Sequence, residues 1–140
     1  MGFIQHEALW ALCLERPRLA AGLWRETLID AAIFRRWLTN VGQRDAFARI
    51  AHILCEMVIR MRAVGLAEDH SCDFPITQSE IGDALGLSVV HVNRTLQEIR
   101  EAGLIVLKGG RLQVLDWDGL KLAGDFDPTY LHLKDRQAAA

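Results

Sequence analysis

Residues 85–96, LGLSVVHVNRTL, hold the side chains whose types and spacing are most informative about chemistry. The guanidinium of Arg94 can bind the two acceptors on the edge of a guanine, and the amide of Asn93 can bind an adenine or a phosphate. Val89 and Val90 offer no hydrogen bond, but an exposed valine can pack on the methyl group of a thymine. Together these four residues predict contacts with the edges of bases.

A second set of residues lies at predicted helix starts and beside a predicted turn. Free N–H groups and small hydroxyls at a helix N-terminus suit phosphate oxygens, and basic residues at a hairpin tip suit a phosphate backbone. The residues that fit this description, and that we expect to contact phosphates, are Thr77, Gln78, Ser88, His91, Lys108 and Arg111.

Catalytic and metal-binding chemistry lack the residue sets that they require. The acidic pairs near the C-terminal end have no placed histidine or cysteine partner and no glycine loop that could hold a phosphate. His52 with Cys55, and His70 with Cys72, each supply two metal ligands, and two ligands do not make a site. We therefore predict that the protein is not an enzyme and uses no catalytic residue, metal or cofactor.

Two helices joined by a tight turn are predicted to position the candidate residues. Thr77, with Glu80 three residues later, forms a capping-box pattern at the start of the first helix. Gly86 supplies the turn, Ser88 caps the second helix and Gly103 ends it. Apolar residues at helical spacing mark the inner face, namely Ile81, Ala84, Leu85, Val92, Leu96 and Ile99.

The segments around these two helices are a loop, a hairpin and a tail. Residues 66–75, LAEDHSCDFP, are polar and aperiodic, which predicts a loop. Two runs rich in β-formers flank Lys-Gly-Gly-Arg at 108–111, which predicts a tight hairpin whose turn needs positive φ. Residues 117–133 predict one short helix and a tail that contains Pro128.

A long helical stretch at residues 18–42 follows Pro17, which suits a first helical turn. Its apolar residues cover more than one face, so the helix needs two neighbours. A second copy of the chain is the expected source of one neighbour, and the alternative is a central core helix in a monomer. The predicted dimer interface consists of Leu23, Leu28, Phe34, Trp37 and Leu38.

The next predicted helix is amphipathic. Gly42 ends the long helix, Asp45 caps the new one and Gly65 closes it. Glu56 precedes Arg60 by four residues, and we expect this pair on the solvent-facing side.

The order of these elements predicts a fold class. It is mainly α with a small β-hairpin wing, in the form of a winged helix-turn-helix preceded by a long dimerisation helix. Residues 1–44 would form the N-terminal helical segment and the dimerisation helix. Residues 45–140 would form the winged helix-turn-helix DNA-binding domain with its C-terminal helix and tail, and residues 88–101 would be the recognition helix.

Composition sets limits on these expectations. The 140 residues are 51% hydrophobic and 24% charged, which is typical of a globular protein with a real core. No apolar run approaches the length of a membrane span and no leader pattern is present, so a cytoplasmic location is expected. The net charge of −2 argues against indiscriminate nucleic-acid binding, so any affinity for DNA must come from the local placement of charge.

The segment FPITQSEIGDALGLSVVHVNRTLQEIREAGLIVLKGGRLQVLD resembles the DNA-binding domain of the Crp/Fnr transcription regulators. It has the Thr-Gln start, the Glu-Ile-Gly helix, the Gly-x-Ser turn, the Val-x-Arg recognition segment, the Gly-Leu-Ile exit and the wing. NVGQRDAFARIAHIL resembles the family's hinge, and FDPTYLHL resembles a tail found in a subgroup. The resemblance extends from about residue 18 to about residue 124.

This resemblance implies a homodimer whose helices at about 18–43 pair along their length. It also implies two recognition helices in successive major grooves of double-stranded DNA, reading a near-palindromic site. The family's three base-reading positions fall on Val89, Val90 and Arg94, of which Arg94 alone matches in chemistry. RNA polymerase is a further candidate partner.

The sequence also departs from the family pattern. These regulators place an effector-binding β-barrel before the long helix, whereas FIQHEALWALCLE, before Pro17, reads as a short helix. The chain is therefore expected to be either a piece of a longer regulator or a short form. The rival hypothesis is a protein-interaction module or dimerisation decoy that no longer binds DNA.

Overall fold

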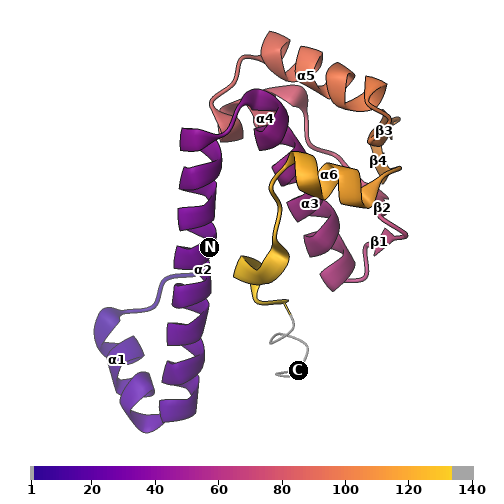
Figure 1. The fold of residues 1–140 in the computed structure, drawn as a ribbon. Coiled ribbons are helices and arrows are strands. Elements are labelled where there is room, and N and C mark those ends of the chain that lie inside the picture. The colour runs from indigo at the N-terminus through magenta and orange to yellow at the C-terminus, as the bar shows by residue number, and fades with distance from the viewer. Residues whose placement is uncertain (1, 134–140) are drawn as a thin grey trace.

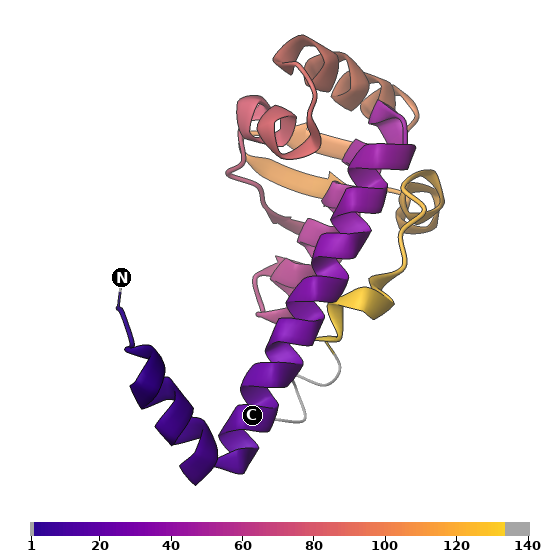
Figure 2. The same cartoon turned by 90° about the vertical axis from the view of Figure 1, so that its left-hand side faces the viewer.

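The computed structural model describes residues 2–133 and divides them between one long helix and a compact winged domain. Figure 1 shows helix α2 (Pro17–Gln43) beside the winged domain, and Figure 2 shows α1 (His6–Glu15) meeting the far end of α2 at an open angle. Among the described helices, none is both long enough and apolar enough to span a bilayer.

The elements of the winged domain follow α2 along the chain. Helix α3 (Ala46–Ala63) leads into strands β1 (Ala67–Glu68) and β2 (Ser71–Asp73). Helices α4 (Gln78–Leu85) and α5 (Val89–Glu101) come next, and then strands β3 (Ile105–Lys108) and β4 (Arg111–Val114). Helix α6 (Trp117–Ala123) completes the winged domain, and the 3₁₀ turn η1 (Pro128–Leu131) follows it in the C-terminal segment. The predicted fold class is confirmed.

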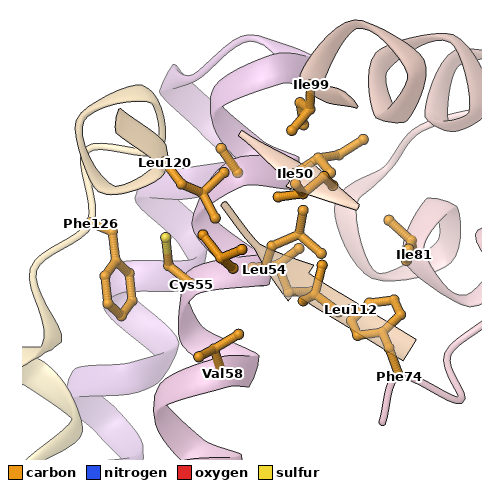
Figure 3. Close-up of a cluster of buried hydrophobic side chains, with 14 of the residues drawn as sticks. Ile50, Leu54, Cys55, Val58, Phe74, Ile81, Ile99, Leu112, Leu120 and Phe126 are labelled. Atoms are coloured by element: carbon orange, nitrogen blue, oxygen red, sulfur yellow. The ribbon is translucent and has the colours of Figure 1, made fainter. Parts of the chain in front are cut away.

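Helix α3 is the centre of the hydrophobic core. Ile50, Leu54 and Val58 are fully buried and lie on one side of it, at spacings of four residues. Figure 3 shows Ile50 and Leu54 between Leu112 of the sheet and Leu120 of α6, with Val58 further along α3. Because α3 contacts α5, α6 and the sheet, it is the element on which the rest of the domain is assembled.

The sheet is larger than the predicted hairpin. Its four strands are antiparallel in the order β1-β2-β4-β3, with Cys72 opposite Leu112. The prediction of a loop at 66–75 was therefore wrong for residues 67–68 and 71–73, which form strands. Strands of two and three residues are too short to display a period of two, and the burial of Cys72 against Leu112 is a long-range effect.

Helix α2 begins at Pro17 as predicted and ends at Gln43, one residue beyond the glycine expected to end it. Within the described residues, α2 buries only Ile29 and Asn40. Phe34 and Leu38 remain 72% and 71% exposed. Within residues 2–133, α2 is therefore not the central core helix of the alternative hypothesis, because much of its apolar surface is left uncovered.

The turn between α4 and α5 depends on two glycines. Gly86 has a φ of 66°, in the left-handed region that a side chain disfavours. Gly82 lies inside α4, where a Cβ atom would approach the carbonyl oxygen of Leu87 to 2.5 Å. The amide of Leu87 donates to the carbonyl of Gly82 at 2.9 Å, which closes the turn. Gly82 is thus required by close approach and Gly86 by conformation.

Substituting Gly82 by alanine is expected to lower the free energy of unfolding by about 1–3 kcal/mol, because the new methyl group meets backbone that cannot move independently. Gly42→Ala is the matched control, since a Cβ atom added there would meet no neighbouring segment within 4 Å and alanine favours helix. Urea unfolding followed by circular dichroism measures both variants. Equal stability of the two variants would contradict the requirement for glycine at position 82.

Candidate nucleic-acid interface

The capping interactions that set the directions of α4 and α5 are present as predicted. The hydroxyl of Thr77 accepts from the amide of Glu80 at 3.2 Å, and the Glu80 carboxylate accepts from the amide of Thr77 at 2.8 Å. The bonds that the amide and the hydroxyl of Thr77 donate to this carboxylate lower the pKa of Glu80. The hydroxyl of Ser88 accepts from the amide of His91 at 3.3 Å. Both helix starts are therefore fixed by local hydrogen bonds.

The outer face of α5 presents the residues that were predicted to meet base edges. Val92, Leu96 and Ile99 are buried, so the opposite side of the helix faces outward. Val90 is 80% exposed, and Val89 is about half exposed. An apolar side chain this exposed at the start of a helix is available for an external contact.

Arg94 lies one turn after Val90 on the same exposed face. Its guanidinium is 3.5 Å from the carboxylate of Glu98, and both side chains are exposed. An ion pair in this setting contributes little to stability, so Arg94 can leave Glu98 at a small cost. The arginine is accessible without being fixed in one direction.

Asn93 and Gln78 link the two helices of the motif. The side-chain amide of Asn93 donates to the side-chain oxygen of Gln78 at 3.1 Å. This bond joins one predicted base-reading residue to one predicted phosphate-contacting residue. It leaves the amide group of Gln78 and the side-chain oxygen of Asn93 for other partners.

The two basic residues of the hairpin differ in their surroundings. Gly109 and Gly110 have φ values of 60° and 74°, as the predicted turn requires. Lys108 is exposed beside this turn. Arg111 instead donates to the hydroxyl of Ser71 at 3.0 Å and is 3.5 Å from Asp73, so its guanidinium is directed to β2.

A buried polar cluster between α2, α3 and the C-terminal segment was not anticipated. Glu56 was expected on the solvent-facing side of α3, but it is 2% exposed, so that expectation was wrong. Its carboxylate accepts from the indole N–H of Trp37 at 3.1 Å and from the hydroxyl of Tyr130 at 2.5 Å. The expected pair with Arg60 is present at 3.0 Å. The cluster was missed because two of the three partners are distant in sequence.

The same cluster changes the interpretation of two residues. Trp37 was predicted to lie in a dimer interface, but its indole packs against the core of its own chain and bonds to Glu56. His52 is buried rather than available to a metal, and its Nδ1 donates to the carbonyl of Gly124 at 2.9 Å. Burial lowers the pKa of His52 and raises that of Tyr130, so both side chains favour their neutral forms.

Asp116, Asp127 and Cys55 have structural roles and are not placed for chemistry. Asp116 and Asp127 accept backbone N–H groups at the starts of α6 and η1. Burial raises the pKa of Cys55 to about 12, so its thiol is unreactive. Within residues 2–133, no cluster of three or more histidine, cysteine, aspartate or glutamate side chains could hold a metal.

Comparison with protein families finds a match to this region. The family described as the Crp-like helix-turn-helix domain matches residues 48–123, which run from α3 to the end of α6. The matched range contains all the predicted base-reading and phosphate-contacting residues.

Curated relatives match over a longer part of the chain. The transcriptional activator protein FnrL of Cereibacter sphaeroides is 31% identical over 98 residues, which are 68% of this chain and 40% of that protein. The transcriptional activator protein FnrA of Stutzerimonas stutzeri is 30% identical over 122 residues, 86% of this chain and 50% of that protein. The chain thus spans about half the length of the curated relatives that it matches.

A solved structure supports the fold independently. The structure of FixK2 from Bradyrhizobium japonicum has a TM-score of 0.75 to this chain at 23% identity. The alignment covers 86% of this chain and 59% of FixK2, so it includes the long helix as well as the winged domain.

Proposed function

The chain belongs to the Crp-like helix-turn-helix family, and we propose that it is a sequence-specific DNA-binding transcription regulator that acts as a homodimer on near-palindromic sites. The observation that carries the proposal is the outer face of α5, where Val90 and Arg94 project from a helix whose inner face is locked into the core. The names of the relatives FnrL and FnrA add support for transcription regulation and make RNA polymerase a candidate partner.

The proposed docking places the N-terminal half of α5 in a major groove. Arg94 would bind a guanine edge, Asn93 an adenine or a phosphate, and Val89 and Val90 the methyl groups of thymines. Contacts with phosphates are proposed for the residues at the helix starts and the hairpin, namely Thr77, Gln78, Ser88, His91, Lys108 and Arg111.

This set of side chains implies an unusual balance between modes of recognition. One arginine and two valines provide fewer hydrogen bonds to bases than a polar recognition helix would. The proposed regulator therefore reads its site to a larger extent through thymine methyl groups and DNA shape. Its preferred sequence need not be that of its relatives.

The proposed dimer interface is the uncovered face of α2. Seven of its residues follow one another at alternating steps of four and three, the spacing of a two-stranded coiled coil. They are Ala20, Trp24, Thr27, Ala31, Phe34, Leu38 and Val41. Of these, Trp24, Phe34 and Leu38 are large and more than half exposed, while Leu23 and Leu28 flank the row. Pairing with a second copy would remove this apolar surface from water.

DNA binding by the purified chain is tested with fluorescent duplexes selected from a random pool, at two salt concentrations. Arg94→Ala is expected to weaken the free energy of binding to the selected duplex by about 1–3 kcal/mol, because it removes a base contact. It should also relax the sequence preference at one base position. Lys108→Ala should weaken binding to all sequences alike, because it removes a phosphate contact. It should also reduce the slope of log affinity against log salt concentration by about 1.

Arg100→Ala is the matched control for Arg94, since it removes the same charge from the other end of α5. It should leave the preferred sequence unchanged. Failure of a confirmed dimer to bind any duplex at low salt would overturn the proposal. That result would favour the rival function, an interaction module or dimerisation decoy.

Dimerisation is tested by sedimentation velocity of Phe34→Glu. Placing a carboxylate in the apolar row should weaken self-association at least about thirtyfold, since truncating a central aromatic residue at an interface commonly costs about 2 kcal/mol or more. Gln43→Glu adds the same charge at an exposed position outside the row and should leave the dimer intact. A Phe34→Glu variant that still sediments as a dimer would refute this interface.

A further inference from the structure

The C-terminal segment from Gly124 to Leu133 occupies the angle between α2 and the winged domain. Figure 1 shows the chain leaving α6 and passing down between α3 and α2, and Figure 2 shows η1 lying alongside α2 from a second direction. Leu131 and Phe126 are buried there. A segment that follows the whole winged domain in sequence therefore packs against the helix that precedes it.

Polar contacts join this segment to both sides of the angle. On the α2 side, the guanidinium of Arg36 donates to the carbonyl of Asp125 at 2.9 Å, and Arg44 pairs with the Asp125 carboxylate at 2.5 Å. The bond from Arg44 lowers the pKa of Asp125 and so keeps it ionised. On the α3 side, the hydroxyl of Tyr130 donates to Glu56, which also holds Trp37 of α2.

Aromatic packing fills the space between these polar contacts. The rings of Phe126 and His52 meet edge to face with centroids 5.1 Å apart, and the ring of Tyr130 is stacked with His52 at 6.0 Å. The guanidinium carbon of Arg36 lies 5.8 Å from the centre of the Tyr130 ring. Tyr130 thus contacts α2 through its ring, and α3 through both its ring and its hydroxyl.

The approach of the segment to α3 is close enough to require glycine. A Cβ atom on Gly124 would lie 2.6 Å from the backbone nitrogen of His52 and 2.9 Å from the carbonyl carbon of Ala51. Both are backbone atoms of a buried helix and cannot be displaced by a side-chain rotation. The segment is therefore seated directly on the backbone of α3.

From these contacts we propose that residues 124–133 form a brace that fixes the angle between α2 and the winged domain, with Tyr130 as its central positioning residue. In a dimer joined through α2, that angle sets the separation of the two recognition helices. The brace would therefore determine which half-site spacing the protein accepts. This consequence for DNA rests on the proposed function, whereas the fixed angle does not.

The angle is followed by pulsed electron–electron double resonance, which measures the distance between nitroxides at the exposed positions Asp30 of α2 and Gln97 of α5. The labelled chain carries Cys13→Ser and is diluted with unlabelled protein, so that distances within one chain dominate. The unsubstituted brace should give one narrow distance distribution. Tyr130→Phe and Arg36→Gln should each broaden this distribution, because each removes a hydrogen bond that involves a charged group. Losing one such bond shifts the equilibrium between the docked and the undocked C-terminal segment by roughly tenfold or more.

Arg35→Gln is the matched control, because Arg35 is the exposed neighbour of Arg36 and carries the same charge. It should keep the narrow distribution. If both Tyr130→Phe and Arg36→Gln also keep the narrow distribution, the proposed brace is wrong. The circular dichroism spectrum of each variant verifies that it is folded.

Duplexes with altered half-site spacing supply a readout that simple loss of stability would not move. The affinity of the Tyr130→Phe variant for a duplex with a single half-site should stay within about twofold of that of the unsubstituted protein. Its preference for one half-site spacing over the others should fall about tenfold. An unchanged spacing preference would overturn the link to DNA. If no variant binds any duplex, the proposed function fails, and the distance measurement still decides the brace.

Discussion

The burial of one carboxylate constrains the arrangement of the whole molecule. Glu56 lies in the middle of α3, and a buried carboxylate is tolerated only when hydrogen-bond donors replace the water that it loses. Its donors come from α2, α3 and the C-terminal segment, through Trp37, Arg60 and Tyr130. The three elements must therefore meet around one side chain, because removing any of them would leave the charge undercompensated.

This constraint connects the two surfaces on which the proposed function depends. One end of the connection is the apolar row on α2, and the other is the outer face of α5. Helix α3 lies between them, with Ile50 and Leu54 packed into the core that also buries Leu96 and with Glu56 turned toward α2. A dimer formed through α2 would thus present two recognition helices from a common rigid support rather than from flexible joints.

The sequence predicts the parts of this structure that depend on local signals. Caps at Thr77 and Ser88, the turn at Gly86 and the buried positions of α5 all depend on residues close together in the sequence, and these predictions were confirmed. The placement of Glu56 failed because its spacing to Arg60 suggested a solvent-facing pair, while its other partners are 19 and 74 residues away. No periodicity reports such contacts. For the same reason the bond from Trp37 to Glu56 was not foreseen, and strands β1 and β2 were missed.

Whether the outer face of α5 reads DNA can be decided by a two-dimensional amide NMR titration of the isotope-labelled protein with its selected duplex. We predict that shifts concentrate at the N-terminal half of α5, at the start of α4 and at the hairpin turn around Gly109, and that a scrambled duplex shifts fewer amides in α5. Shifts confined to α2, or a spectrum that the selected duplex leaves unchanged, would show that α5 is not the DNA-reading surface.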